Sequence, residues 1–281
     1  HWARRRPGRR RPLPVIRVLS WNLWWRYGPW EQRQEAIAAT LTEVRPDLCG
    51  LQEVWGGPGG NQAADLAGRL GMHWCWAPAT KGRTAGGDEL SLGNAILSRW
   101  PIAAQAETAL PVGDLADESR VALHARIEAP GGTLPMVTTH LTYGAGRSQV
   151  RTAQVRALAE FVAGHAADCA YPPVLTGDLN AEPGSDELRL LGGLLTAPAV
   201  PGLVLIDAWR YADPGDPGFT WHHRNGYQAN SLIPDSRIDY VLVGLPGRGR
   251  GKVRSAALAG AEPVAGVWPS DHFAVVAEIQ E

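Results

Sequence analysis

Short apolar runs alternate along this chain with stretches whose apolar residues recur at helical spacing. The runs predict β-strands at 15–21, 47–54, 94–97, 121–127, 134–141, 174–180 and 273–279. Helical spacing predicts helices at 31–44, 61–70 and 148–167, and a fourth helix that begins at Ser185. Pro46 ends the first helix, Ser148 is expected to cap the third, and Gly131-Gly132 predicts a hairpin turn. The distribution of turn-forming and loop-forming residues favours one continuous domain over 14–281.

One long segment carries neither pattern. Residues 211–236 are dense in Pro, Gly, Asn and Asp, which predicts a long surface loop. Loops of this length in compact domains are usually functional or disordered.

Several apolar runs carry at one end a polar residue that a buried strand has no packing reason to hold. In four cases the polar residue follows the run, at Asn22, Glu53, His140 and Asp178. In two cases it precedes the run, at Asp239 and His272. Antiparallel pairing of the two kinds of strand would bring these residues to one rim. Carboxylates, amides and imidazoles gathered there suit a hard divalent cation and a phosphate ester.

Two of these segments supply the acids. Glu53 is the strongest single metal candidate, because a carboxylate at a strand tip can face a cleft; a plain surface acid is the alternative. Residues two apart in a strand face the same side, so Asp178 and Asn180 can point into one site. A carboxylate that takes a proton from water, beside an amide that holds this water or a phosphate oxygen, is a sensible pair. An Asx turn closing the strand is the alternative.

The segment Ser270-Asp271-His272 stands directly before the final predicted strand. A carboxylate that holds one imidazole nitrogen would raise the pKa of His272 and leave the other nitrogen free to meet a phosphate. His140, at the end of its own strand, can supply a second donor. An ordinary structural histidine is the alternative.

Seven short segments, in the same order, resemble the endonuclease/exonuclease/phosphatase superfamily of deoxyribonucleases, sphingomyelinases, inositol polyphosphate 5-phosphatases and deadenylases. They are residues 19–22, 51–54, 93–99, 139–141, 176–180, 237–240 and 270–272. The resemblance implies a four-layer α/β sandwich, in which two mostly antiparallel sheets pack face to face with helices on both outer faces. It also implies Mg²⁺ or Mn²⁺ as cofactor, with Glu53 as the principal ligand and Asn22 and Asp271 close to the metal.

The same resemblance assigns the catalytic roles. Asp178 would orient or deprotonate the attacking water, and Asn180 would fix it. His140 and His272 would stabilise the phosphorane-like charge, and Asp239 would orient His272. In-line attack on phosphorus would follow.

Five further residues are candidates for substrate contact: Asn94, Arg120, Arg237, Trp24 and Trp221. Either arginine could reach a phosphate or pair with an acid of the site. Trp24 lies just beyond Asn22 and could stack on a base or cover a lipid or sugar, or it could pack in the core. Trp221 belongs to the long loop, and Asn94 belongs to the third matching segment.

Composition sets the class of protein. A chain of 281 residues with 44% hydrophobic residues can bury a large core. No apolar stretch approaches the roughly 20 residues that span a bilayer. The three cysteines, an odd number, make no disulfide framework and favour a reducing compartment. We therefore expect a cytoplasmic, monomeric protein.

Charge is uneven along the chain. Residues 1–11 hold six arginines and no acid, so the rest of the chain has 21 basic and 28 acidic residues, a net charge of about −7. We interpret residues 1–13 as a disordered Arg/Pro-rich leader, although such a tail could also touch nucleic acid or anionic lipid.

The sequence therefore predicts a Mg²⁺- or Mn²⁺-dependent hydrolase that cleaves a phosphate ester, as a nuclease-like phosphodiesterase or as a phosphatase, by in-line attack of an activated water. Its substrate could be nucleic acid or a phospholipid headgroup. The alternatives are a non-hydrolytic binding or scaffold protein, or an enzyme with an atypical reaction on the same fold, and a nucleic-acid binder acting through the arginines of its leader.

Overall fold

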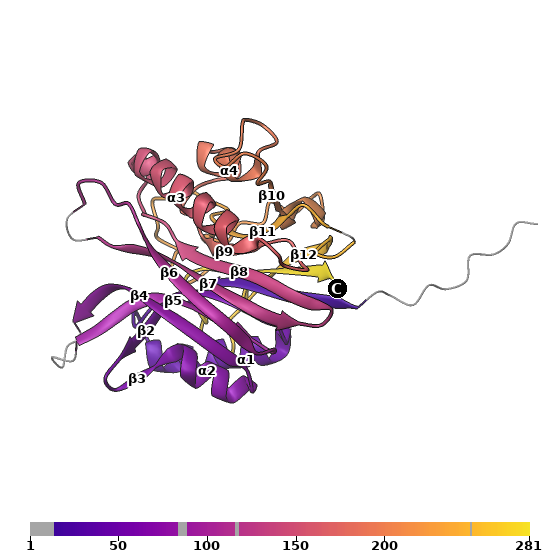
Figure 1. Cartoon of the computed structure of the whole chain (residues 1–281). Coiled ribbons are helices and arrows are strands. Elements are labelled where there is room, and N and C mark those ends of the chain that lie inside the picture. Colours follow the sequence, from indigo (N-terminus) through magenta and orange to yellow (C-terminus); the bar gives the residue numbers. More distant parts are fainter. Residues whose placement is uncertain (1–13, 84–88, 116–117, 248) are drawn as a thin grey trace, which may run out of the picture.

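Two β-sheets pack face to face, with helices on their outer sides, in the computed structural model (Figure 1). The structure describes residues 14–83, 89–115, 118–247 and 249–281. The predicted leader, 1–13, lies outside the described residues. None of the helices in the described ranges is long and apolar enough to cross a membrane.

The first sheet has seven strands and contains both terminal strands of the fold. Its strands are β1 (Val15–Asn22), β2 (Leu48–Gly57), β3 (Gly60–Asn61), β4 (His73–Arg83), β5 (Glu89–Ser98), β12 (Val253–Ala259) and β13 (Ala274–Gln280). They lie in the order β12-β13-β1-β2-β5-β4, and β3 pairs with β2. Strands β1 and β2 are parallel, whereas β13 runs antiparallel to β1.

The second sheet has six strands. They are β6 (Ile102–Leu110), β7 (Arg120–Ala129), β8 (Gly132–His140), β9 (Val174–Asp178), β10 (Leu205–Asp207) and β11 (Asp239–Gly244), in the order β10-β11-β9-β8-β7-β6. The predicted hairpin is present between β7 and β8. Strands β8 and β9 are parallel, and β11 is antiparallel to β9.

Helices cover the outer faces. Helices α1 (Trp30–Val44) and α2 (Gln62–Leu70) lie on the first sheet, and α3 (Ser148–Ala166) and α4 (Asp186–Gly192) lie on the second (Figure 1). The fourth helix begins within one residue of the predicted start, and Ser185 caps it, since its Oγ accepts the Leu188 N–H. Ser148 does not cap α3: it is the first helical residue and follows a short 3₁₀ turn. The predicted four-layer α/β sandwich is confirmed.

Three apolar clusters separate these layers. The largest fills the space between the sheets, where Leu48, Ile96, Val241 and Val275 are buried. A second cluster lies beneath α1 and α2, and a third beneath α3 and α4. The sheets are therefore fixed from both sides, which holds their strand ends in place.

Gly50 lies where the two sheets approach each other closely. A Cβ atom added there would collide with Thr176 Oγ1 and lie 2.9 Å from Thr138 Oγ1. We expect Gly50→Ala to lower the free energy of unfolding by about 2 kcal/mol, because overpacking forces both hydroxyls to move. Urea denaturation measures this. Gly68→Ala is the matched control, since a Cβ at Gly68 in α2 meets nothing within 4 Å; an equal loss in both variants would contradict the explanation.

Strand register builds the predicted rim. Asp239 at the start of β11 pairs with Asp178 at the end of β9, and His140 at the end of β8 lies beside Asp178. In the other sheet, Asn22 at the end of β1 lies beside Gln52 of β2. The polar residues therefore meet at one edge of the sandwich.

The segment 211–236 differs from the predicted surface loop. Trp221 and Ser236 form a β-bridge, and Thr220, Asn225, Gln228 and Ser236 are buried. Buried side chains of this segment bond to the 238–239 and 270–271 backbone or side chains. It is therefore packed against the rim rather than lying free on the surface.

Candidate active site

Asp178 stands at the centre of the rim. It ends β9 with 1% of its surface exposed, and its Oδ2 accepts a hydrogen bond from Asn22 Nδ2 at 3.0 Å. Its Oδ1 accepts the backbone N–H of Asn180 at 3.0 Å. The predicted strand to 180 was too long: Asn180 lies beyond β9 in the left-handed region (φ 48°). A turn, not strand alternation, brings the two side chains together.

His140 is a neutral imidazole in this arrangement. Burial, together with the nearby Arg120 guanidinium, lowers the pKa of His140 to about 3. Asn180 Nδ2 lies 3.1 Å from His140 Nε2 and also donates to the Leu141 carbonyl at 3.1 Å, which fixes the orientation of the amide. His140 Nε2 must therefore accept, and Nδ1 carries the proton. Among the described residues, His140 Nδ1 has no hydrogen-bond partner, so it can donate to a substrate oxygen.

His272, in contrast to His140, carries a positive charge. Its Nδ1 lies 2.9 Å from Asp239 Oδ2, and the Asp239 carboxylate is fully buried. Burial by itself lowers the pKa of His272, but the carboxylates of Asp239, Asp271 and Asp178 together raise it well above its usual range. The imidazole is therefore protonated at neutral pH. Its Nε2 lies 3.8 Å from Asp178 Oδ2 and is the cationic donor of the rim.

Glu53 reaches the rim by an irregularity in its strand. It does not stand at a strand tip as predicted, because β2 continues to Gly57. The pairing of β2 with β5 shifts between Leu51 and Val54, and Glu53 takes a left-handed backbone (φ 51°). This bulge turns its carboxylate toward the rim, where Oε1 accepts from Asn22 Nδ2 at 3.2 Å.

The carboxyl groups of Glu53 and Asp271 have raised pKa values. Burial, reinforced by the Asp271 carboxylate, raises the pKa of Glu53 to about 7. Burial also raises the pKa of Asp271 to about 6. Glu53 Oε2 is buried and has no hydrogen-bond partner within the described ranges. A cation bound here would supply that partner and stabilise both carboxylates in their charged form.

A second set of potential ligands lies nearby. Single atoms of Asp178, Asp239 and His272 lie within 4.8 Å of one another. His272 is protonated and bonded to Asp239, so its nitrogens are not free to ligate a metal. We therefore favour the Glu53 and Asp271 side for a metal, with Asn22 in contact with Glu53.

Several buried residues that support the rim were not identified from sequence. Gln228 Nε2 donates to Asp271 Oδ2 at 3.0 Å, and Asn225 Nδ2 donates to the Ser270 carbonyl at 2.8 Å. Thr220 Oγ1 accepts the backbone N–H groups of Ile238 and Asp239. Their Pro/Gly-rich surroundings carry no local signal of burial. Polar residues inside a long irregular segment are the one hint that could have marked them.

The five proposed substrate contacts have different surroundings. Arg120 pairs with Glu118, and Arg237 pairs with Asp207 at 2.7 Å. Asn94 is 2% exposed and donates to the Val121 carbonyl of the opposite sheet, which gives it a structural role. Trp24 follows Asn22 at the rim, and the Trp221 ring lies 5.1 Å from the His272 ring. The two tryptophans are thus at the site.

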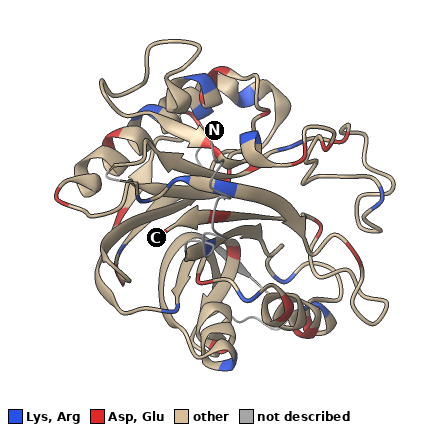
Figure 2. Ribbon diagram, turned by 90° about the vertical axis from the view of Figure 1, so that its right-hand side faces the viewer, with Lys and Arg blue, Asp and Glu red and all other residues tan. Residues whose placement is uncertain are grey.

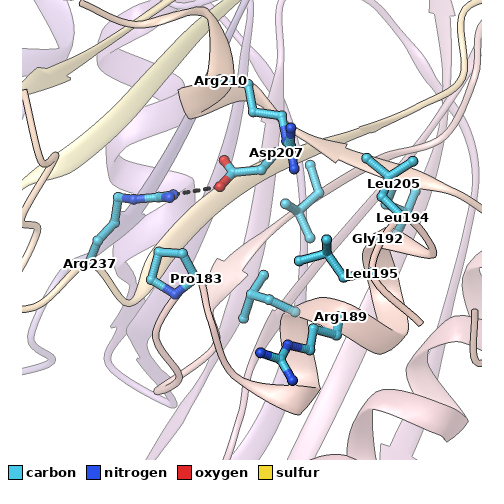
Figure 3. Close-up of a pocket in the computed structure, with 11 residues that line it drawn as sticks. Pro183, Arg189, Gly192, Leu194, Leu195, Leu205, Asp207, Arg210 and Arg237 are labelled. Atoms are coloured by element: carbon cyan, nitrogen blue, oxygen red, sulfur yellow. Dashed lines mark hydrogen bonds and ion pairs between the residues drawn. The ribbon is translucent and has the colours of Figure 1, made fainter. Parts of the chain in front are cut away.

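A pocket of about 200 Å³ is shown in Figure 3, and its lining contains none of the rim residues. Leucines of the α4 and β10 region line it, with Arg189, Arg210 and Arg237 around them. Arg237 alone among the described candidate residues faces it, and its guanidinium is held there by Asp207. This placement draws Arg237 away from the rim chemistry.

Charge elsewhere is mixed in sign. Figure 2 shows basic and acidic residues interspersed over the helices and loops. Exposed ion pairs such as Arg69–Glu35, at 2.7 Å, contribute little. The buried acids of the rim are therefore the distinctive electrostatic feature.

Comparisons with known proteins agree with the fold. A model of the Endonuclease/Exonuclease/phosphatase family matches residues 19–272. A protein described as an endonuclease/exonuclease/phosphatase from Beutenbergia cavernae DSM 12333 is 24% identical, with a TM-score of 0.70, covering 95% of this chain and 71% of that chain. The human Nocturnin catalytic domain is 21% identical, with a TM-score of 0.71 and 95% of each chain covered. A mannosyl-6-phosphatase from Bacteroides thetaiotaomicron is 22% identical, with a TM-score of 0.70, covering 95% of this chain and 100% of that one. Curated protein sequences give no significant match.

Proposed function

The chain belongs to the endonuclease/exonuclease/phosphatase family, and we propose that it hydrolyses a phosphate ester with the help of Mg²⁺ or Mn²⁺. The observation that carries this proposal is the pairing of a cationic His272 and a neutral donor His140 around Asp178, beside the unpartnered Glu53 Oε2. Acid, base and anion-binding groups thus face one small volume.

Glu53 and Asp271 are the proposed metal ligands, with Asn22 beside them. The donor set fits a hard cation, since it consists of carboxylate oxygens that are buried and raised in pKa. When bound, the ion would neutralise charge on the phosphate oxygens as the reaction proceeds. Gln228 already holds one oxygen of Asp271 in place.

Asp178 is the proposed general base, because it is the carboxylate at the centre of the rim. Asn22 Nδ2 and the Asn180 N–H hold its two oxygens, so its orientation is fixed. Asn180 is fixed in turn by His140 and Leu141. A water beside Asp178 and Asn180 would lose its proton to Asp178 as its oxygen attacks phosphorus, while the ester P–O bond on the opposite side breaks and the alcohol group leaves.

The imidazoles complete the reaction. Negative charge grows on the non-bridging phosphate oxygens in the transition state, and His272 Nε2–H and His140 Nδ1–H are donors that can meet it. Asp239 holds His272 in the tautomer and orientation that this requires. The groups are fixed before substrate binds, so they need little reorganisation.

Chelation tests the proposed cofactor. We expect EDTA to remove hydrolysis of phosphate esters and Mg²⁺ or Mn²⁺ to restore it, because the buried acids need a cation to act. A screen over DNA, RNA, phosphoinositides, sphingomyelin and small phosphate esters supplies the assay. Calorimetry with Mn²⁺ alone reads the metal site without turnover. Full activity after complete chelation would contradict metal dependence.

Asp239→Asn tests the proposed role of the His272 charge. Burial lowers the pKa of His272, and the Asp239 carboxylate is the largest of the effects that raise it. Without that carboxylate the imidazole loses its proton at lower pH, so the alkaline limb of the kcat/KM profile moves toward acid pH. We expect kcat to fall about 10²-fold at pH 8. An NMR titration of the His272 ring reads the pKa directly, and an unchanged profile would be inconsistent with this role.

A further inference from the structure

Four aromatic rings form a continuous row beside the metal side of the rim. We call Trp24, Trp25, Tyr27 and Tyr227 the aromatic shelf. Ring centroids are 5.4 Å apart for Trp25 and Tyr27, 6.1 Å for Tyr27 and Trp24, and 4.6 Å for Trp24 and Tyr227. Two segments at least 200 residues apart therefore build one surface of rings.

The shelf is bonded directly to the site. The Trp24 N–H donates to Asn22 Oδ1, and the Trp25 N–H donates to the Glu53 carbonyl, both at 2.9 Å. At the other end, Gln228, which follows Tyr227, donates to Asp271. Each proposed metal-side residue is thus in contact with the shelf or its immediate neighbour.

The backbone under the shelf is strained. Trp24 and Trp25 both have positive φ values, 56° and 36°. Bulky residues rarely adopt this conformation, which costs of order 1–3 kcal/mol per residue and persists where the surroundings enforce it. Contacts around the two tryptophans must therefore hold this part of the backbone in place.

Arg33 is what enforces it. Its side chain is 1% exposed, and its N–H groups donate to five carbonyls, those of Leu23, Trp24, Trp25, Tyr27 and Pro269. The guanidinium also lies 4.8 Å from the Trp24 ring centroid. One buried arginine therefore fixes the shelf and joins it to the segment that carries Asp271.

The shelf is open to solvent at Tyr27. This residue is 48% exposed, whereas Trp24, Trp25 and Tyr227 are half-buried. Tyr143, in the loop that follows β8, is 69% exposed. The arginines expected to take phosphates, Arg120 and Arg237, are each held by an acid. The shelf thus offers exposed ring surface beside the site, whereas both of these arginines are engaged in ion pairs.

We propose that the aromatic shelf binds a planar ring of the substrate, a nucleobase or an aryl group attached close to the reacting phosphate. This inference rests on the proposed hydrolysis and narrows its substrate class. Stacking on aromatic side chains is sequence-tolerant and favours flat groups over saturated ones.

Binding tests the shelf without turnover. Calorimetry measures the dissociation constants of two pairs of ligands, with Ca²⁺ in place of Mg²⁺ or Mn²⁺ so that binding is read without turnover. The first pair is adenosine 5′-phosphate and ribose 5-phosphate, and the second is benzyl phosphate and cyclohexylmethyl phosphate. Each pair shares its phosphate and differs in the planar ring, and the two pairs distinguish a nucleobase from a simple aryl group. We expect one planar member or both to bind about 5- to 30-fold more tightly than its partner, and Tyr27→Ala to remove most of that difference. Trp74→Ala, at a 43% exposed ring of β4, is the control.

Kinetics separate this inference from the proposed function. The same four esters and their methyl diesters are assayed with Mg²⁺ and Mn²⁺. Loss of the planar preference in Tyr27→Ala, seen mainly in KM, supports the shelf. If planar esters bind selectively but none of the esters is hydrolysed, the proposed hydrolysis of these esters is rejected and the proposed binding of planar rings by the shelf is retained. Equal binding of planar and saturated partners, or an unchanged preference in Tyr27→Ala, would overturn the shelf.

Discussion

Glu53→Gln is expected to lower kcat/KM for phosphate-ester hydrolysis by at least about 10³-fold. The substitution keeps the size of the side chain and its bond to Asn22 but removes the charge that would attract the cation. Mn²⁺ binding measured by calorimetry should weaken in parallel. Glu35→Gln is the matched control, because Glu35 is an exposed acid paired with Arg69. Activity near the wild-type level in Glu53→Gln would reject Glu53 as a ligand.

The same variant should not damage the metal-free fold. The pKa of Glu53 is raised to about 7 by burial and by Asp271, so the folded state holds a proton that the unfolded state has released. Metal-free wild-type protein therefore loses stability as pH rises from about 4 to 7, and Glu53→Gln lacks this loss. We expect its thermal midpoint at pH 8 to equal or exceed that of the wild type. A large drop would mean that lost activity reports misfolding.

His272→Ala is the second large effect, an expected fall in kcat of about 10³-fold. It removes the cationic donor and leaves the buried Asp239 carboxylate without its partner, so some stability is lost as well. The double variant Asp239→Asn/His272→Ala separates the two effects: it should recover stability and lose no further activity. His223→Ala is the control, since this imidazole pairs with Asp235 outside the rim. Additive activity losses in the double variant would contradict a shared role.

The rim was predictable because its pattern is local. Apolar runs that end at Asn22, His140 and Asp178 place these residues at strand ends, and the opposite order at Asp239 requires an antiparallel partner. The sandwich itself followed from the resemblance. Core strands have a strong apolar signal because both of their faces are buried.

Other elements lacked such a signal. Strand β6, with its many alanines and polar residues, is largely exposed and lies at the edge of its sheet, so no apolar run marked it. Glu53 depends on a bulge and Asn180 on a turn, and neither follows from spacing alone. Arg33 lies inside a helix, where an arginine usually faces solvent. Such residues are recognised through tertiary contacts.

The pairing of β1 with β13 has a consequence for biosynthesis. Ser270 Oγ donates to the Asn22 carbonyl at 2.6 Å across 248 residues of sequence, and β1 takes its place beside β13 only when both ends of the fold are present. Asp271 therefore joins Glu53 late in translation. A nascent chain that lacks β13 would hold only one of the two proposed metal ligands, so under the proposed mechanism it would stay inactive until β13 has been made and has paired with β1.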